Sequence, residues 1–174
     1  MIETKDIMKN FEGKTPLFTL HDFVMFPKTV YNFNIFEEKY IKMISDILKG
    51  NKLFTINLTQ NKKPYNVATL CHILEAQKLD NGNYDIVVSG IRKVKIDNKK
   101  KDHIYETANL TIINEDLFVS KEQLKRKKLI NKFLSLVSTD SKDLNLKIVD
   151  TSLISTEMLV NLGCLILPLE NCDK

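Results

Sequence analysis

One short segment of the chain changes its hydrophobic period, and this change defines two consecutive elements. In VYNFNI (30–35) apolar and polar residues alternate, which is typical of a strand with one buried face. From Ile41 onward the apolar residues recur three and four positions apart, as on one side of an amphipathic helix. Lys49 suits the last turn of such a helix, and Gly50 suits the residue after its end. We therefore predict a strand followed at once by a helix over 37–49.

Further apolar segments predict a mostly β arrangement around this helix. DNGN (80–83) is a strong hairpin turn, because Asn and Gly accept a positive φ. Gly90 predicts a bulge or a sharp corner in the returning strand. The predicted extended segments are two short pieces within 16–27 and strands at 53–58, 66–79, 84–89, 94–96 and 105–113, with loops at 61–64 and 99–102.

The two ends of the chain differ from this β region. Residues 1–14 are polar and aperiodic, so we expect a flexible tail. After Asn114 the pattern becomes helical, with one helix predicted over 120–137 and a second over 155–166, before a proline. Strands followed by helices indicate the α+β class.

Composition limits the classes of protein that need to be considered. Charged residues make up 28% and hydrophobic residues 43% of the chain, which is typical of a soluble globular protein. The N-terminus lacks the apolar core of a secretion signal, and no apolar run approaches the ~18 residues of a membrane span. We therefore expect a cytoplasmic protein without membrane contact. Its three cysteines, Cys71, Cys164 and Cys172, are expected to be reduced and inert.

Two long segments carry a resemblance to a known family. TPLFTLHDFVMFPKTVYNFNIFEEKYIKMISDILKGNKLF (15–54) resembles the opening of the Lon protease N-terminal, or substrate-binding, domain, whose pattern runs PLFPL, VLFPG and LPLxIFExRY. VATLCHILEAQKLDNGNYDIVVSGIRKVKI (67–96) is similar to the family's VGTxxxI, LPDGRY and GxxRVxI segments. The likeness covers residues 15–113 in order and spacing. The segment 154–174 looks like the helical end of standalone bacterial Lon-domain proteins.

Four positions depart from the family pattern. Lys28 replaces the glycine that follows Phe-Pro, and Ala68 replaces the glycine of VGT. Glu38 and Lys39 replace the Pro-Arg of IFEPRY. The apolar positions are kept, so these departures bear on a binding surface rather than on the fold.

The resemblance implies a fold and a function. The fold is a PUA-like β-barrel with one inserted helix over 15–115, followed by a small helical bundle over 116–174. In full-length Lon proteases the corresponding domain helps to select substrates and to assemble the ring. This chain is accordingly expected to bind unfolded or partner polypeptide without ATPase or protease parts, and to be no enzyme, with no cofactor and no metal.

Aromatic residues near the start of the predicted barrel are the candidates for such binding. The functional interpretation is an apolar groove at the barrel edge that holds unfolded peptide. Packing in the core is the interpretation that we favour for Phe26, Phe33, Phe36 and Tyr40. The candidate peptide-binding residues are Phe26, Tyr31, Phe33, Phe36 and Tyr40.

A basic hairpin over 92–101 offers an alternative function. PUA-like barrels include RNA-binding members, and a patch of cations can follow phosphates. Aromatic residues that would stack on bases are not interleaved with these charges, and the net charge of +4 is mild, so a solvated surface is favoured. The alternative RNA-binding residues are Arg92, Lys93, Lys95, Lys99, Lys100 and Lys101, and a second basic run lies at 125–128.

Motifs for catalysis are weak. Gly13-Lys14-Thr15 matches the end of a phosphate-binding loop, but Met8 occupies the position of the first glycine and no strand is predicted before it. The three histidines are dispersed, so a metal site is not expected.

The C-terminal segment is expected to be incomplete. LILPLENCDK (165–174) resembles the sequence that precedes one more helix in standalone relatives. Leu159, Leu162 and Ile166 would then be poorly covered, and such an apolar patch favours self-association through the helical segment.

Overall fold

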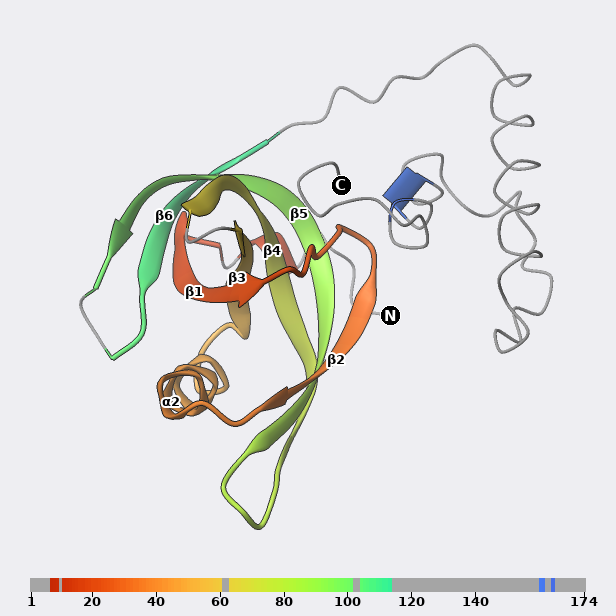
Figure 1. The fold of residues 1–174 in the computed structure, drawn as a ribbon, viewed down its shortest axis with the longest axis vertical. Helices are drawn as coiled ribbons and strands as arrows, with labels where there is room; N and C mark the ends of the chain where they lie inside the picture. The colour runs from red at the N-terminus through yellow and green to blue at the C-terminus, as the bar shows by residue number, and fades with distance from the viewer. Residues whose placement is uncertain are drawn as a thin grey trace, which may run out of the picture. The chain divides into compact units, whose positions relative to one another are not determined.

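The structure is a computed structural model, and it describes residues 7–9, 11–60, 63–101 and 104–113, together with Val160, Asn161 and Cys164. The chain divides into two compact units, Met1–Asn114 and Glu115–Lys174, and almost all described residues belong to the first. Its elements are β1 (Lys14–His21), β2 (Val30–Ile35), α2 (Glu38–Ile47), β3 (Leu53–Gln60), β4 (Lys63–Lys78), β5 (Tyr84–Lys100) and β6 (Thr107–Ile112), shown in Figure 1.

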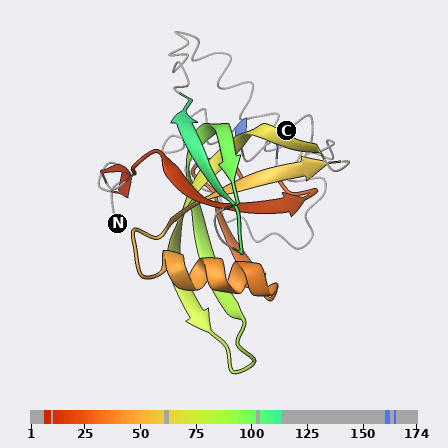
Figure 2. The same cartoon turned by 90° about the vertical axis from the view of Figure 1, so that its left-hand side faces the viewer.

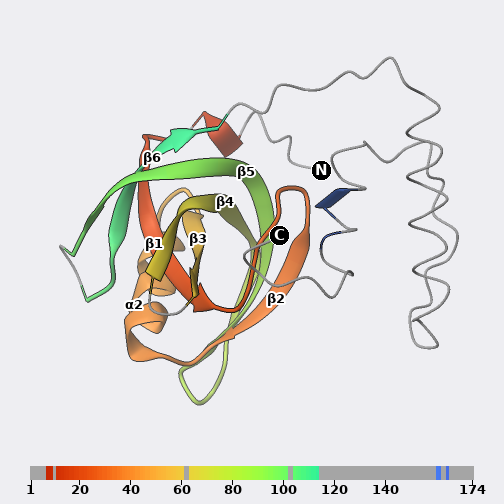
Figure 3. The ribbon, with the colours of Figure 1, turned by 45° about the horizontal axis from the view of Figure 1, so that its top comes forward.

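The six strands form one sheet whose pairings lead back to their starting point. The order is β2-β5-β4-β3-β1-β6, and β6 also pairs with β5. β1 and β3 are parallel, whereas the other pairs are antiparallel. Among the described residues β2 pairs with β5 alone, so it lies at the margin of the sheet (Figure 3). This mostly β arrangement agrees with the expected PUA-like β fold, whereas the closed barrel stays a prediction.

Gly90 allows the segment before β2 to approach β5 closely. The register shifts here, because Gly90 pairs with Cys71 and Arg92 pairs with Leu70. A Cβ at Gly90 would lie 2.2 Å from the carbonyl oxygen of Phe26, so no larger residue fits without movement of the backbone. The bulge predicted at this glycine is therefore confirmed.

Helix α2 covers one face of the sheet and completes the larger of two cores. Figure 2 shows α2 lying across the strands, with the β4–β5 hairpin extending past it. The helix buries Tyr40, Met43, Ile44 and Ile47. The larger core consists of Phe18, Met25, Ile35, Tyr40, Met43, Ile44, Ile47, Phe54, Ile56, Cys71, Ile73, Tyr84, Ile86, Val88 and Tyr105.

A second core lies among β1, β3, β4, β5 and β6. Ile7, Met8 and Phe11 pack against it, which differs from the flexible tail expected for this part of 1–14. These three apolar side chains are too few to form a periodic pattern, so this contact could not be predicted from the sequence. The second core consists of Leu17, Leu53, Ala68, Leu70, Val94, Ile96, Ala108 and Leu110.

Several element boundaries differ from the sequence-based expectation. Helix α2 ends with Leu48 as its C-cap, and Gly50 does not adopt the positive φ of a C′ residue. The left-handed residue in this turn is instead Lys52, with φ 58°. Lys99 and Lys100 continue β5 rather than forming a loop, because they pair with β6. The hairpin turn at 80–83 is confirmed, with φ 88° at its glycine.

Few residues of the second unit are described. Val160, Asn161 and Cys164 are helical, as predicted for 155–166. The helix predicted over 120–137, and Leu159, Leu162 and Ile166, lie outside the described residues. Within the part of the chain that is described, no helix has the length and apolarity needed to cross a membrane.

Candidate binding surface

Three aromatic side chains form a half-buried row beside the margin of the sheet. Alternation along β2 places Tyr31 and Phe33 on the face of the larger core, where both remain partly exposed. Phe23 joins them from the segment before β2, with its ring centroid 5.0 Å from that of Tyr31 and 5.4 Å from that of Phe33. Both contacts are edge-to-face, a favourable geometry for aromatic pairs. We call Phe23, Tyr31 and Phe33 the aromatic row.

The sequence pointed to two members of this row and missed the third. Phe23 lies in a short apolar segment without clear periodicity, so its place beside β2 depends on the path of the chain between β1 and β2. The only available signal was its position between two aromatic segments. Burial raises the pKa of the Tyr31 hydroxyl, which stays neutral and able to donate a hydrogen bond at physiological pH.

For Phe26 and Tyr40 the favoured expectation of core packing is confirmed. Phe26 and Tyr40 are only 8% and 6% exposed, so both belong to the core. The Tyr40 hydroxyl donates a hydrogen bond to the carbonyl oxygen of Thr19 at 3.1 Å. The Tyr40 ring lies 4.5 Å from Phe18, which in turn lies 5.9 Å from Phe33. Through Phe18, the buried Tyr40 thus packs behind Phe33 of the aromatic row.

Phe36 differs from the favoured expectation of core packing. Its side chain is 68% exposed, at the junction between β2 and α2, so core packing is wrong for this residue. The period changes here from two to 3.6, and a residue between two elements belongs to the buried face of neither. An exposed phenylalanine directly after the row extends the apolar surface that a ligand could meet.

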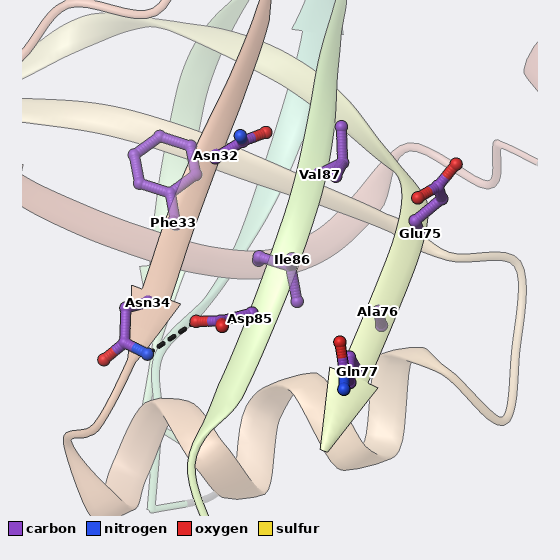
Figure 4. Close-up of a pocket in the computed structure, with 9 residues that line it drawn as sticks. All are labelled: Asn32, Phe33, Asn34, Glu75, Ala76, Gln77, Asp85, Ile86 and Val87. Carbon is purple, nitrogen blue, oxygen red and sulfur yellow. Dashed lines mark hydrogen bonds between the residues drawn. The ribbon is translucent and has the colours of Figure 1, made fainter. Parts of the chain in front are cut away.

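The opposite face of the same strands is polar and hollowed. Asn34 donates a hydrogen bond to Asp85 of β5 at 2.6 Å, which ties β2 to its neighbour (Figure 4). Glu75 extends from β4 on the far side of β5. We call this hollow the outer pocket. Its volume is about 430 Å³, and it is lined by Asn32, Phe33, Asn34, Glu75, Ala76, Gln77, Asp85, Ile86 and Val87.

Lys39, in the first turn of α2, occupies a position where the resemblance implies arginine. Burial disfavours its charge, but the hydrogen bond and charge of Glu37, at 3.1 Å, outweigh that effect and raise the pKa of Lys39. Its ammonium nitrogen also lies 4.4 Å from the centre of the Tyr40 ring. The Lys39 ammonium is therefore held at the start of α2 by Glu37 and Tyr40.

The residues of the basic hairpin are not carried by one regular stretch of strand. Val94 is buried and Lys93 and Lys95 flank it, so strand alternation directs both lysines away from the core. A register shift near Asp97 then interrupts the strand before Lys99. Lys99 is partly buried, and desolvation lowers its pKa despite the nearby charge of Glu106.

The Gly13-Lys14-Thr15 motif does not form a phosphate-binding loop. Gly13 has φ 78° and Lys14 begins a strand rather than a helix. The Thr15 hydroxyl is buried and lies 2.8 Å from that of Thr55, so it is not available for a metal or a phosphate. The described residues contain no group of three His, Cys, Asp or Glu that could hold a metal ion.

The fold is similar to those of solved Lon N-terminal domains. A Lon N-terminal domain protein from Xanthomonas campestris matches with a TM-score of 0.57 and 19% identity, over 70% of this chain and 73% of that one. The N-terminal domain of the Mycobacterium avium complex Lon protease matches with a TM-score of 0.56 and 15% identity, over 72% of this chain and 66% of that one. At these identities the likeness concerns the fold.

The chain belongs to the family of the ATP-dependent protease La (LON) substrate-binding domain, whose profile matches residues 14–174. Its relatives include Lon proteases of Endomicrobium trichonymphae, 26% identical over 121 residues, and of Rickettsia prowazekii, 26% identical over 151 residues. These matches cover 64% and 78% of this chain, but only 15% and 19% of the relatives. The chain thus spans less than a fifth of the length of these proteases.

Proposed function

We propose that this chain is a non-catalytic module that binds exposed apolar segments of unfolded or partner polypeptides. The observation that carries the proposal is the aromatic row, which lies half exposed at the margin of the sheet and is followed directly by the exposed Phe36. Family membership supports the same role, since the family is defined as a substrate-binding domain. We place this activity in the cytoplasm of a bacterium, in connection with proteolysis.

Anisotropy of a fluorescent unfolded protein tests the proposal. A reduced and carboxymethylated protein should bind the full chain, and Tyr31→Ser combined with Phe36→Ser should weaken binding about tenfold, or ~1.4 kcal/mol. Val67→Ser combined with Ile104→Ser is the matched control, because both residues are exposed apolar side chains outside the row and should leave affinity unchanged. Equal losses in the two double variants, or no binding at all, would contradict the proposal.

We further infer that residues 1–174 neither bind nor hydrolyse ATP. Lys14 and Thr15 lie in a strand, where they cannot form the backbone cradle of a nucleotide phosphate. Titration calorimetry with magnesium-ATP should therefore detect no binding, and Lys14→Ala should change nothing. ATP turnover that disappears in Lys14→Ala would contradict this inference.

A further inference from the structure

Among the described residues several strands of the sheet have a side without a strand partner, including β1 beyond Leu17, which pairs there with β3 alone. β2 pairs with β5 along one side only. β4 continues to Lys78, beyond its last pair with β3 at His72, so its final residues also have an unpaired side. An unpaired edge presents backbone N–H and C=O groups to any extended chain, and proteins normally protect such edges with charge, proline or bulges.

The edges of β2 and β4 differ in this protection. The free part of β4 carries Glu75 and Lys78, and a register shift between Ile73 and Glu75 interrupts its regular pairing. β2 reads VYNFNI, with no charge and no proline, and its pairing with β5 runs without a shift from Val30 to Ile35. The edge of β2, beside the aromatic row, is therefore free and unprotected along all six residues of the strand, whereas the unpaired side of β1 covers only its last residues.

The side chains of β2 indicate what would pair there. A strand added to β2 would alternate its side chains between the two faces, at the ~4.8 Å spacing of neighbouring strands. On one face they would lie against Tyr31 and Phe33. On the other they would lie beside Asn32 and Asn34, with the carboxylate of Asp85 next along the sheet. Apolar side chains suit the first face, and a long basic side chain can cross to the carboxylate on the second.

The charge of the outer pocket supports this choice of partner. Its two charged lining residues, Glu75 and Asp85, are both acidic, although the whole chain carries a net charge of +4. Within the described residues neither carboxylate forms an ion pair; Asp85 accepts its hydrogen bond from the neutral amide of Asn34. An incoming cation would thus meet an acidic group that no described cation already neutralises.

We propose that an extended polypeptide docks on this chain by adding a strand to the free edge of β2. Its apolar side chains lie on the aromatic row, and its intervening lysine or arginine side chains point to the outer pocket and Asp85. This inference rests on the proposed function and specifies how the polypeptide is held. Main-chain hydrogen bonds would supply affinity without strict sequence dependence, as in other cases of strand addition, and the alternating pattern would supply selectivity.

Backbone methylation of a peptide probe tests strand addition directly. The probe is a synthetic peptide that alternates valine and lysine over at least the six residues of β2. In a strand, alternate residues direct their N–H groups to opposite edges, so methylating the nitrogens of all valines or of all lysines blocks one edge each. One methylated peptide should bind the full chain about tenfold more weakly than the parent, and the other within about twofold of it. Equal behaviour of the two, whether both bind or both fail, overturns the proposal.

Matched aspartates on β5 test the charged face. Asp85→Asn should weaken binding of the parent peptide about two- to fivefold, the range of an exposed ion pair. Asp97→Asn is the control, because this residue is also exposed on β5 and accepts a cross-strand hydrogen bond, from Thr111 at 2.7 Å, but lies outside the pocket. A similar loss in both variants, or none in either, overturns the assignment of basic side chains to the outer pocket.

Two further measurements separate the proposal from its alternatives. The unfolded protein probe described above reports on the proposed function alone: if it binds but the methylated peptides behave alike, strand addition fails and polypeptide binding stands. If neither probe binds, both fail. Sedimentation of the free chain shows whether a second copy occupies the edge. A dimer that the parent peptide does not dissociate assigns the edge to self-association and overturns the proposal, whereas a monomer that binds the peptide upholds it.

Discussion

Lys28 occupies a backbone position that favours glycine. It replaces the glycine of the family's VLFPG segment, and its φ of 63° lies in the left-handed region. This conformation costs a residue with a Cβ about 1–2 kcal/mol, which glycine would avoid at a cost of about 0.5–1 kcal/mol in chain entropy. Lys28→Gly should therefore stabilise the fold by about 0.5–1 kcal/mol in urea denaturation. Ala68→Gly, in a buried part of β4 with ordinary φ, should instead destabilise it by about 1 kcal/mol; stabilisation by both substitutions would contradict this explanation.

Glycine is required at position 90 for a different reason, because there is no room for a Cβ atom. A Cβ there would lie 2.2 Å from the carbonyl oxygen of Phe26, and the backbone of Gly90 also pairs with Thr29 and Lys28 at 2.9 and 2.8 Å. Because the close contacts of this Cβ are all with the backbone of Phe26 and Pro27, Gly90→Ala should destabilise the fold by about 3 kcal/mol, the upper range of overpacking. Gly50→Ala is the control, since its Cβ would meet only an ordinary contact at 3.8 Å. Urea denaturation should give a clearly lower midpoint for Gly90→Ala than for Gly50→Ala. Equal midpoints would contradict the steric explanation for Gly90.

At the scale of elements, Asp46 ties α2 to the connection between β5 and β6. Its carboxylate accepts hydrogen bonds from Lys42 at 2.6 Å and from the Tyr105 hydroxyl at 3.1 Å. Lys42, with Tyr105 and the charge of Lys49 in support, outweighs burial and lowers the pKa of Asp46 below 3.8. A lowered folded-state pKa means that the stabilisation is present above the unfolded value and is lost as the pH falls through the folded one.

Asp46→Asn should therefore cost about 0.5–1 kcal/mol of stability at pH 7, the upper range of an exposed pair. The difference from the unaltered chain should shrink below pH 3.8 and vanish once Asp46 is protonated in the folded state. Urea denaturation at a series of pH values measures it. Tyr105→Phe keeps the ring and removes only the hydroxyl. It should therefore reduce the stability at pH 7 by less than Asp46→Asn does. A difference independent of pH would show that the charge of Asp46 is not its cause.

The elements could be predicted wherever one period dominates the sequence. β2, α2 and the hairpin turn follow from alternation, helical spacing and DNGN, and the bulge follows from Gly90. Prediction was poorer where tertiary contacts decide the outcome. The charges of Lys99 and Lys100 concealed a strand that forms because β6 is available as a partner. For the site, β2 suggested Tyr31 and Phe33, whereas the contribution of Phe23 depends on how a loop packs.

At the scale of the whole molecule, the circuit of strand pairs leaves the margin occupied by β2 as the natural place for an additional chain. Pairings from β5 through β4, β3, β1 and β6 return to β5, so these strands are largely satisfied by one another. β2 stands outside this circuit and carries the aromatic row on one face and part of the outer pocket on the other. The position of the proposed site thus follows from the topology of the sheet, and the residues of β2 carry the apolar surface on which the proposal rests.

The distribution of charge over the molecule argues against RNA as the main ligand. Binding to a nucleic acid depends on released counterions, so it falls steeply with salt in proportion to the phosphates contacted. Lys93 and Lys95 point away from the core, whereas Lys99 is partly buried and lies beyond a register shift. We therefore expect no measurable RNA binding at ~0.15 M salt and only weak, salt-sensitive binding at ~0.05 M. Replacing Lys99, Lys100 and Lys101 with Ala should flatten the slope of log affinity against log salt no more than replacing Lys125, Lys127 and Lys128, a control with the same change in charge. Tight binding at ~0.15 M that only the hairpin variant loses would instead identify 92–101 as an RNA-binding surface.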